Sequence, residues 1–457
     1  MSRLLISTCA LAAVATLSAS SCGNRAQYDS AQQAGANPPM PAAHDFLAPP
    51  IDVPKFVGWR EGASPKVAPG LKIEKIAAGL AHPRQVYALP NGDLLVAESN
   101  SPNEEAVTTP KQLIAGLITA RSGKKTKGAN RISLLRKRSD GSGLWDRFVF
   151  IDQLHSPFGM QLVGNTLFVA DTDAILAFPY QPGETHIDGR GVELTDLPDT
   201  VNHHWTKALL ASRDGKKLYV GVGSNSNVGE NGLDVEYRRA DVLEVDIATG
   251  GSRIYASGIR NPTGLQWEPK TGRLWAIANE RDEIGADLVP DYLTFVRAGG
   301  FYGWPYSYYG QHVDRRAQPQ RPDLVAKAIR PDYAIGSHVA PLGLMFYTGE
   351  NLPAPYRGGA FIGEHGSWDR SPISGYMVAF VPFANGEPVG APRPVVTGFN
   401  SDDSKESYGA PVGVTQDQDG ALIIADDVGN SVWRVTGAGK PSGDATSSAP
   451  AKALAPR

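Results

Sequence analysis

The sequence predicts an all-β fold, specifically a six-bladed β-propeller with loop insertions. Glycine and proline are abundant, with 50 and 35 copies among 457 residues, and helical periodicity is scarce. This composition is typical of many short strands joined by turns. In addition, one pattern recurs six times along the chain: a polar or proline-containing start, an apolar strand, a tight turn and a second apolar strand.

The six copies begin at His82, Ser156, His203, Arg260, His338 and Ala410. Their turns are centred on Gly92, Gly164, Gly215, Gly272, approximately Gly359, and Gly420. These turns lie about 50 to 90 residues apart, whereas a four-stranded blade needs about 40 to 50. Residues 100–130 and 283–335 account for the excess as insertions. A seven-bladed propeller and a pair of β-sandwiches are the alternative architectures.

The chain divides into four parts. Residues 1–22 contain Arg3, an apolar run and then small residues ending in Cys22, which is typical of an export signal of the lipoprotein type. We expect Cys22 to be the lipidation site and the protein to be exported, periplasmic and membrane-anchored, with ordinary secretory cleavage or a retained anchor as alternatives. Residues 23–55 are expected to be a disordered tether, 56–436 the propeller, and 437–457 a disordered tail.

Charge and cysteine usage exclude several function classes. The net charge is −3 with scattered basic residues, so nucleic acid is not expected as a partner. The only other cysteine, Cys9, lies inside the signal, so the mature chain has at most one thiol and no internal disulfide. No HExxH, CxxC or GxSxG motif is present, which leaves zinc-protease, thiol-redox and α/β-hydrolase functions without support.

Polar residues open most of the six copies. In a propeller, the innermost strand of each blade points one end at the central channel, and small-molecule sites are built there from one or two residues of each blade. The residues that open the six copies are therefore expected to form a ring around the channel: Arg84, Ser156, His203 with His204, Arg260 with Asn261, His338 and Ala410. Of these, Ser156, His203 and His338 are expected to line a substrate pocket. So many hydrogen-bonding groups at strand starts would not be needed for packing alone.

Several long motifs then resemble the sorbosone dehydrogenase branch of the soluble PQQ-dependent sugar dehydrogenases. They are NHHWTK, GVGSNSN, RNPTGLQW, NERDEIGADLVPDY, GGFYGWPYSYYGQHVD, HGSWDRSPISGY and ADDVGNSVWRV. The resemblance covers roughly residues 70–436. It implies a propeller that holds pyrroloquinoline quinone (PQQ) over the channel mouth, with Ca²⁺ beside it, and that oxidises a sugar hydroxyl or aldehyde hydrate.

The resemblance also implies roles for individual residues. His204 matches the histidine that acts as general base, and Arg260 and Asn261 match the pair that holds the quinone oxygens. Asn279 falls near a side chain that binds the cofactor. Arg370 lies where a basic residue meets a cofactor carboxylate.

The metal site and one departure from the family pattern follow from the same comparison. Glu280 and Arg281 lie near the backbone carbonyls that hold calcium in the family, while the acidic run from Asp282 offers side-chain oxygens as an alternative. Ala410 stands where the family commonly has an arginine. A tricarboxylate cofactor needs cationic partners, so this change is expected to weaken cofactor binding.

The residue chemistry fits a hydride transfer. A histidine with a pKa near 6.5 suits a general base at neutral pH, and a planar arginine cation suits a quinone oxygen on which charge builds up. The structural alternatives are a packed His204 beside Trp205 and an ion pair between blades for Arg260. We therefore predict a PQQ-dependent oxidoreductase acting on a sugar or sugar aldehyde. The alternatives are a non-catalytic sugar- or partner-binding propeller lipoprotein and a calcium-dependent lactonase.

Overall fold

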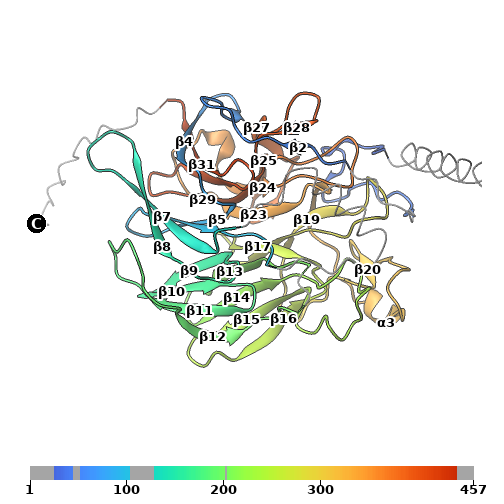
Figure 1. Ribbon diagram of the computed structural model, residues 1–457. Coiled ribbons are helices and arrows are strands. Elements are labelled where there is room, and N and C mark those ends of the chain that lie inside the picture. The colour runs from blue at the N-terminus through green and yellow to red at the C-terminus, as the bar shows by residue number, and fades with distance from the viewer. Residues whose placement is uncertain (1–24, 45–51, 103–127, 201–202, 440–457) are drawn as a thin grey trace, which may run out of the picture.

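The computed structural model describes residues 25–44, 52–102, 128–200 and 203–439 (Figure 1). Six four-stranded antiparallel blades surround one axis, which confirms the six-bladed propeller. The first blade is β5 (Pro83–Ala88), β6 (Leu94–Glu98), β7 (Arg131–Lys137) and β8 (Trp145–Ile151). The second is β9 (Gly159–Val163), β10 (Thr166–Ala170), β11 (Ala174–Pro179) and β12 (Val192–Asp196). The third is β13 (Lys207–Ala211), β14 (Lys217–Val222), β15 (Asp241–Asp246) and β16 (Ser252–Ser257).

The fourth blade is β17 (Pro262–Trp267), β18 (Leu274–Ala278), β19 (Pro290–Phe295) and β22 (Tyr333–Ser337). The fifth is β23 (Pro341–Phe346), β24 (Gly359–Glu364), β25 (Met377–Ala384) and β27 (Arg393–Thr397). The sixth is β29 (Pro411–Gln416), β30 (Leu422–Asp426), β31 (Ser431–Gly437) and, as its outer strand, β4 (Leu71–Ala78). The first strand of the ring therefore closes the last blade, and Figure 1 shows blue β4 beside red β31.

The inner strands β5, β9, β13, β17, β23 and β29 contact one another in that order around the axis. They lie close because small residues face the neighbouring blade. A Cβ atom on Gly343 would lie 2.1 Å from the carbonyl oxygen of Val412, so only glycine fits there. Large apolar side chains from successive blades, among them Trp275 and Trp433, fill the space between the sheets. This packing fixes the six strand starts relative to one another.

Residues 25–44 correct one expectation. The predicted tether of residues 23–55 is not disordered over this part, because it lies against the fourth and fifth blades. β1 (Ala34–Gly35) pairs with β22, and the fully buried Gln33 donates from Nε2 to the carbonyl oxygen of Asp287 at 2.8 Å. A short polar segment was expected to be disordered because it has no apolar periodicity. Here it is held by backbone hydrogen bonds to the edge of a blade.

Two further boundaries differ from expectation. The predicted insertion of residues 283–335 contains a regular blade strand, β19, so that only the segment after it is an insertion, with β20 (Ser307–Tyr308), β21 (His312–Val313) and α3 (Pro322–Val325). Gly359 begins β24 and is not the centre of a turn. The remaining short elements are β2 (Lys55–Phe56), β3 (Lys66–Val67), η1 (Ala354–Tyr356), β26 (Glu387–Pro388) and β28 (Glu406–Ser407).

Several predictions concern residues outside the described part of the chain. The signal peptide of residues 1–22, the lipidation of Cys22 and the tail beyond residue 439 all fall there, and they stay predictions. Within the described ranges, no helix has the length and apolar character needed to cross a membrane.

Candidate active site

The candidate site lies at the end of the propeller where inner strands begin and second strands end, which we call the site face. In the fourth blade, for example, Pro262 at the start of β17 pairs with Ala278 at the end of β18. The hairpin turns lie at the opposite end of each blade. The polar residues before each inner strand and after each second strand therefore share one face of the molecule.

His204 and Asn261 approach each other across Gly223. A Cβ atom on Gly223 would lie 2.4 Å from both His204 Cβ and Asn261 Oδ1, so a side chain there would separate the two residues. His203 packs edge-on against the His204 ring, with ring centroids 4.6 Å apart. His203 is exposed and His204 half-buried, as expected for residues at the mouth of a site. The structure thus brings together the predicted base and one predicted cofactor ligand.

The surroundings of the His204 ring determine which of its two nitrogens carries the proton. Nδ1 lies 2.8 Å from the carbonyl oxygen of Ser224, which can only accept, so Nδ1 carries the proton and donates. Nε2 then holds the lone pair. Burial, followed by the nearby Arg260 cation and His203, lowers the pKa of His204 well below its usual value. The imidazole is therefore a neutral proton acceptor at neutral pH.

Arg260 is buried and its guanidinium is held on several sides. Nε donates to the carbonyl oxygen of Asn227 at 3.2 Å, and Nη2 donates to Asn227 Oδ1 at 2.9 Å. Nη1 donates to the carbonyl oxygen of Glu280 at 2.5 Å, and Nη2 also pairs with Asp282 Oδ2 at 3.2 Å. Arg260 therefore has an ion pair, but with Asp282 of its own blade, whereas the structural alternative was an ion pair between blades. The same contacts fix a cation close enough to His204 to lower its pKa.

Asn261 and Asn279 both have unfilled hydrogen-bonding capacity. Their Oδ1 atoms are buried and have no partner among the described residues, while the Asn279 amide N–H donates to the Asn261 carbonyl oxygen at 3.1 Å. Buried amides are normally satisfied, so two adjacent exceptions indicate a place where a ligand completes the bonding. The unfilled atoms are acceptor oxygens, so the ligand atoms that meet them must supply an N–H or O–H donor or a cation, while the Arg260 cation beside them suits a ligand oxygen that carries negative charge.

Glu280 and Arg281 form a buried pair whose side chains are engaged within the protein. Arg281 Nε donates to Glu280 Oε2 at 3.1 Å, and Arg281 Nη1 also pairs with Asp314 Oδ2 at 3.1 Å. The carbonyl oxygen of Glu280 already accepts from Arg260. The expected metal role therefore stays a prediction for the two main-chain carbonyls, and the side chains have a structural task.

Arg370 has other partners than the cofactor carboxylate expected for it. Its Nη1 donates to the Ala286 carbonyl oxygen at 2.7 Å and pairs with Asp287 Oδ1 at 3.1 Å. Its Nη2 donates to the carbonyl oxygen of Tyr28 at 2.6 Å. Arg370 thus ties the N-terminal segment to the loop after β18. The sequence could not reveal this because residue 28 was assigned to a tether.

Ser156 and His338 lie on the site face, and both are buried. Ser156 Oγ donates to the carbonyl oxygen of Asn100 at 2.7 Å and is 1% exposed, so it is positioned below the surface. His338 lies between the carboxylates of Asp282 and Asp369, with its Nδ1 3.3 Å and 3.1 Å from them. Of the three residues expected to line a substrate pocket, only His203 is exposed.

Ala410 corrects the expected ring of channel residues. Its side chain is fully buried in an apolar cluster that includes Tyr376 and Trp433, so it does not face the channel. The expectation came from the position of Ala410 just before the inner strand β29, and that position alone does not fix the direction of the side chain. An arginine at position 410 would need room that this cluster does not provide.

A second ionic cluster was missed from the sequence. The Asp427 carboxylate accepts from His82 Nδ1 at 2.6 Å, Arg84 Nη1 at 2.6 Å and His365 Nε2 at 2.9 Å. The Arg84 cation and the hydrogen bonds with His365 and His82 hold the pKa of Asp427 well below its usual range despite burial. The signal was available, because His82 stands just before an inner strand and His365 and Asp427 stand just after second strands, which places all three on the site face.

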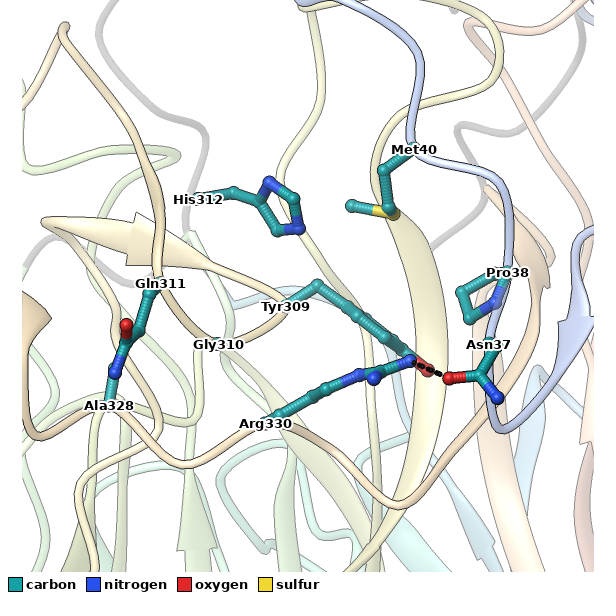
Figure 2. A pocket seen from close by; sticks show the side chains of 9 residues that line it. All are labelled: Asn37, Pro38, Met40, Tyr309, Gly310, Gln311, His312, Ala328 and Arg330. Atoms are coloured by element: carbon teal, nitrogen blue, oxygen red, sulfur yellow. Dashed lines mark hydrogen bonds between the residues drawn. The ribbon is translucent and has the colours of Figure 1, made fainter.

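A cavity of about 470 Å³ opens elsewhere, between the N-terminal segment and the insertion after β19. Figure 2 shows Arg330 reaching across it to Asn37, whose Oδ1 accepts from Arg330 Nη2 at 2.9 Å. Tyr309, His312 and Met40 also line it. None of the predicted site residues does, so this cavity is separate from the site built around His204.

Known proteins that are similar to this chain include a PQQ-dependent sugar dehydrogenase. Residues 65–290 and 314–438 match the model of a family described as TrAA12-like. An uncharacterised protein of Borreliella burgdorferi is 29% identical over 293 residues, covering 62% of this chain and 76% of the relative. A pyrroloquinoline quinone-dependent sugar dehydrogenase of Hypocrea jecorina is 22% identical over 414 residues, covering 80% and 87%.

Among solved structures, the fold is similar to the holo form of the pyranose dehydrogenase PQQ domain from Coprinopsis cinerea. The TM-score is 0.66 at 19% identity, and the match covers 84% of this chain and 100% of that one. At this identity the likeness establishes the fold.

Proposed function

The chain belongs to the TrAA12-like family, and on that premise we propose that it is a PQQ-dependent oxidoreductase acting on a sugar or sugar aldehyde of the sorbosone or aldose type. The observation that carries the proposal is the pairing of a neutral His204 with the unpartnered amides of Asn261 and Asn279. Curated relatives described as PQQ-dependent sugar and pyranose dehydrogenases support the substrate class.

His204 is the proposed general base. Its Nε2 accepts the proton of the substrate hydroxyl or aldehyde hydrate, while Nδ1–H remains bonded to Ser224. This second bond orients the ring and stabilises the imidazolium that forms. The lowered pKa of His204 keeps the acceptor deprotonated, although it also makes the base weaker.

The cofactor is held, in this proposal, by Arg260, Asn261 and Asn279. When bound, PQQ supplies an electrophilic quinone that accepts a hydride from the substrate carbon. Arg260 is already fixed by Asn227 and Asp282, so its cation needs no reorganisation as negative charge develops on an adjacent oxygen. Ca²⁺ beside the cofactor, at the main-chain carbonyls of Glu280 and Arg281, belongs to the same proposal.

Reconstitution tests the function. The purified protein is stripped of metal, supplied with PQQ and CaCl₂, and offered glucose, other aldoses or sorbosone with a redox dye as electron acceptor. We expect dye reduction that depends on both PQQ and sugar. Opening of a sugar lactone without any change in the PQQ spectrum would instead support a calcium-dependent lactonase. Neither reaction, with sugar binding by calorimetry, would support a non-catalytic binding propeller.

A further inference from the structure

Three side chains from separate segments meet on the site face, and two of them, His338 and Asp369, have no task in the proposed function. Asp282 follows β18, His338 precedes β23 and Asp369 follows β24, and their ligand atoms all lie within 4.8 Å of one another. His338 Nδ1 is 3.3 Å from Asp282 Oδ1 and 3.1 Å from Asp369 Oδ1. His338 and Asp369 are almost completely buried, and the Asp282 side chain is 18% exposed.

Each member of this group is oriented by a second contact on its far side. His338 Nε2 lies 3.1 Å from the carbonyl oxygen of Gly285, which fixes the proton on Nε2 and directs Nδ1 toward the two carboxylates. Asp282 Oδ2 pairs with Arg260, and Asp369 Oδ2 accepts from the amide N–H of Glu283 at 3.2 Å. Outer contacts of this kind are typical of the residues around a metal ion.

Without an ion, the group is incompletely bonded. A protonated His338 has one Nδ1–H for two carboxylate oxygens, and Asp369 Oδ1 has no hydrogen-bond partner among the described residues although the residue is 2% exposed. Leaving a buried carboxylate oxygen unbonded is costly. A cation placed among the three ligand atoms satisfies Asp282, His338 and Asp369 together.

We propose that Asp282, His338 and Asp369 form a binding site for a divalent transition-metal ion of the Mn²⁺ or Zn²⁺ kind. Ligands about 2.0–2.2 Å from such an ion lie roughly 3.0–3.5 Å from one another, in line with the two separations from His338 Nδ1. One imidazole and two carboxylates suit these metals, whereas Ca²⁺ takes six to eight oxygen ligands. The site uses side chains, whereas the expected calcium position uses the main-chain carbonyls of residues 280 and 281. It includes Asp282, whose side chain was the alternative calcium ligand, so the choice of metal decides between the two.

The adjacent Arg260 limits and shapes this site. Its guanidinium pairs with one oxygen of Asp282, so only the other oxygen is free to bind the ion. The positive charge of Arg260 also lowers the affinity of the site for a metal ion. The metal and Arg260 would then share one carboxylate. Because Arg260 also contacts Asn227 and Glu280, the ion would stiffen the segment that carries the proposed cofactor ligands.

Isothermal titration calorimetry on the full chain tests the proposal. The protein is depleted of metal with EDTA, dialysed, and titrated in the absence of PQQ with MnCl₂, ZnCl₂ or CaCl₂. We expect one Mn²⁺ or Zn²⁺ per chain, bound at least about tenfold more tightly than Ca²⁺ at this site. Asp369→Asn and His338→Gln should each weaken this binding at least about 100-fold. Asp214→Asn, in an exposed turn at the opposite end of the propeller, should bind as the parent does.

The outcomes separate this site from the proposed function. Unchanged binding in both Asp369→Asn and His338→Gln would overturn the proposal, as would absence of Mn²⁺ and Zn²⁺ binding or a preference for Ca²⁺. Circular dichroism shows whether each variant is folded, and two variants of different chemistry keep the test valid if one is not. Because no PQQ, sugar or dye is present, a failure to reduce dye in the reconstitution would leave this result untouched.

Discussion

Two ionic clusters lie on the same face of the propeller and differ in how far their carboxylates are satisfied. In the first, a single carboxylate, Asp427, accepts from three cationic or potentially cationic side chains. In the second, two carboxylates, Asp282 and Asp369, converge on one histidine. Burial raises the pKa of Asp369 to about 7, whereas the partners of Asp427 hold its pKa well below the usual range.

This difference indicates that the Asp427 cluster has a structural role and that the cluster of Asp282, His338 and Asp369 has a binding role. A buried anion with enough partners joins elements, and here Asp427 connects the first, fifth and sixth blades through Arg84 and His365. A buried anion with too few partners is costly unless something else binds it. Burial and charge alone therefore do not identify a functional site. In these two clusters, the buried polar atoms that lack a hydrogen-bond partner distinguish the binding site better than burial or charge does.

Asp427→Asn should have the largest effect, and it is on stability. Removing the charge leaves Arg84 buried beside neutral partners, which should lower the free energy of unfolding by about 3–5 kcal/mol. In the metal-free protein, Asp369→Asn should change it by less than about 1 kcal/mol, because burial already opposes the charge that the substitution removes and His338 keeps Asp282 as a partner. Urea unfolding followed by circular dichroism gives both values. Equal losses in the two variants would erase the distinction between the clusters.

The second-largest effect is expected on turnover, and it is measured by comparing substitutions at His204 and His365. His204→Ala should lower the rate of PQQ-dependent sugar oxidation by about 10² or more, the scale of a lost general base, with folding intact. His365→Ala should destabilise the protein, because Asp427 loses a partner, but should change turnover by less than about threefold. Steady-state kinetics on the reconstituted enzyme measures both. Wild-type turnover in a PQQ-loaded His204→Ala variant would place the base elsewhere.

Substitution of Asp171 is expected to have a smaller effect on stability, and this effect depends on pH. This buried carboxylate accepts one bond, from the amide N–H of His155 at 2.7 Å, and burial raises its pKa to about 7. The folded state therefore keeps a proton that the unfolded state releases above about pH 4, so this group's contribution to stability falls as pH rises from about 4 to about 7.

Asp171→Asn removes this fall in stability with rising pH. The variant should gain stability over the parent as pH rises through this window, reaching about 2 kcal/mol at pH 8 because the new amide hydrogens offset part of the linkage term. Thermal or urea unfolding from pH 4.5 to 8 measures the difference. A constant difference across the window would show that Asp171 titrates normally.

The fold was predictable from the sequence because its signal is local. Each inner hairpin joins two strands across a short turn, and six copies of that pattern gave the number of blades. The pairing of Asn261 with His204 also followed from strand starts that share one face.

The rest of the site depends on contacts between distant segments. Asp369 meets Glu283, 86 residues away, and no periodicity connects them. Ala410 was misplaced because its position just before β29 does not fix the direction of its side chain, which packs in a cluster with Tyr376 and Trp433. The N-terminal segment lacks the apolar pattern that predicts structure, yet Arg370 holds it through a main-chain carbonyl that any residue could supply.

The strand that closes the ring has a consequence for the time course of biosynthesis. β4 pairs with β31, and Arg434 meets Glu74 across 360 residues of sequence. At about 5–20 residues per second, a ribosome needs roughly 20–70 s to make the second partner after the first. During that interval β4 has an unpaired edge. Other chains can pair with that edge in the meantime, so a chaperone that covers it would be expected to raise the yield of folded protein.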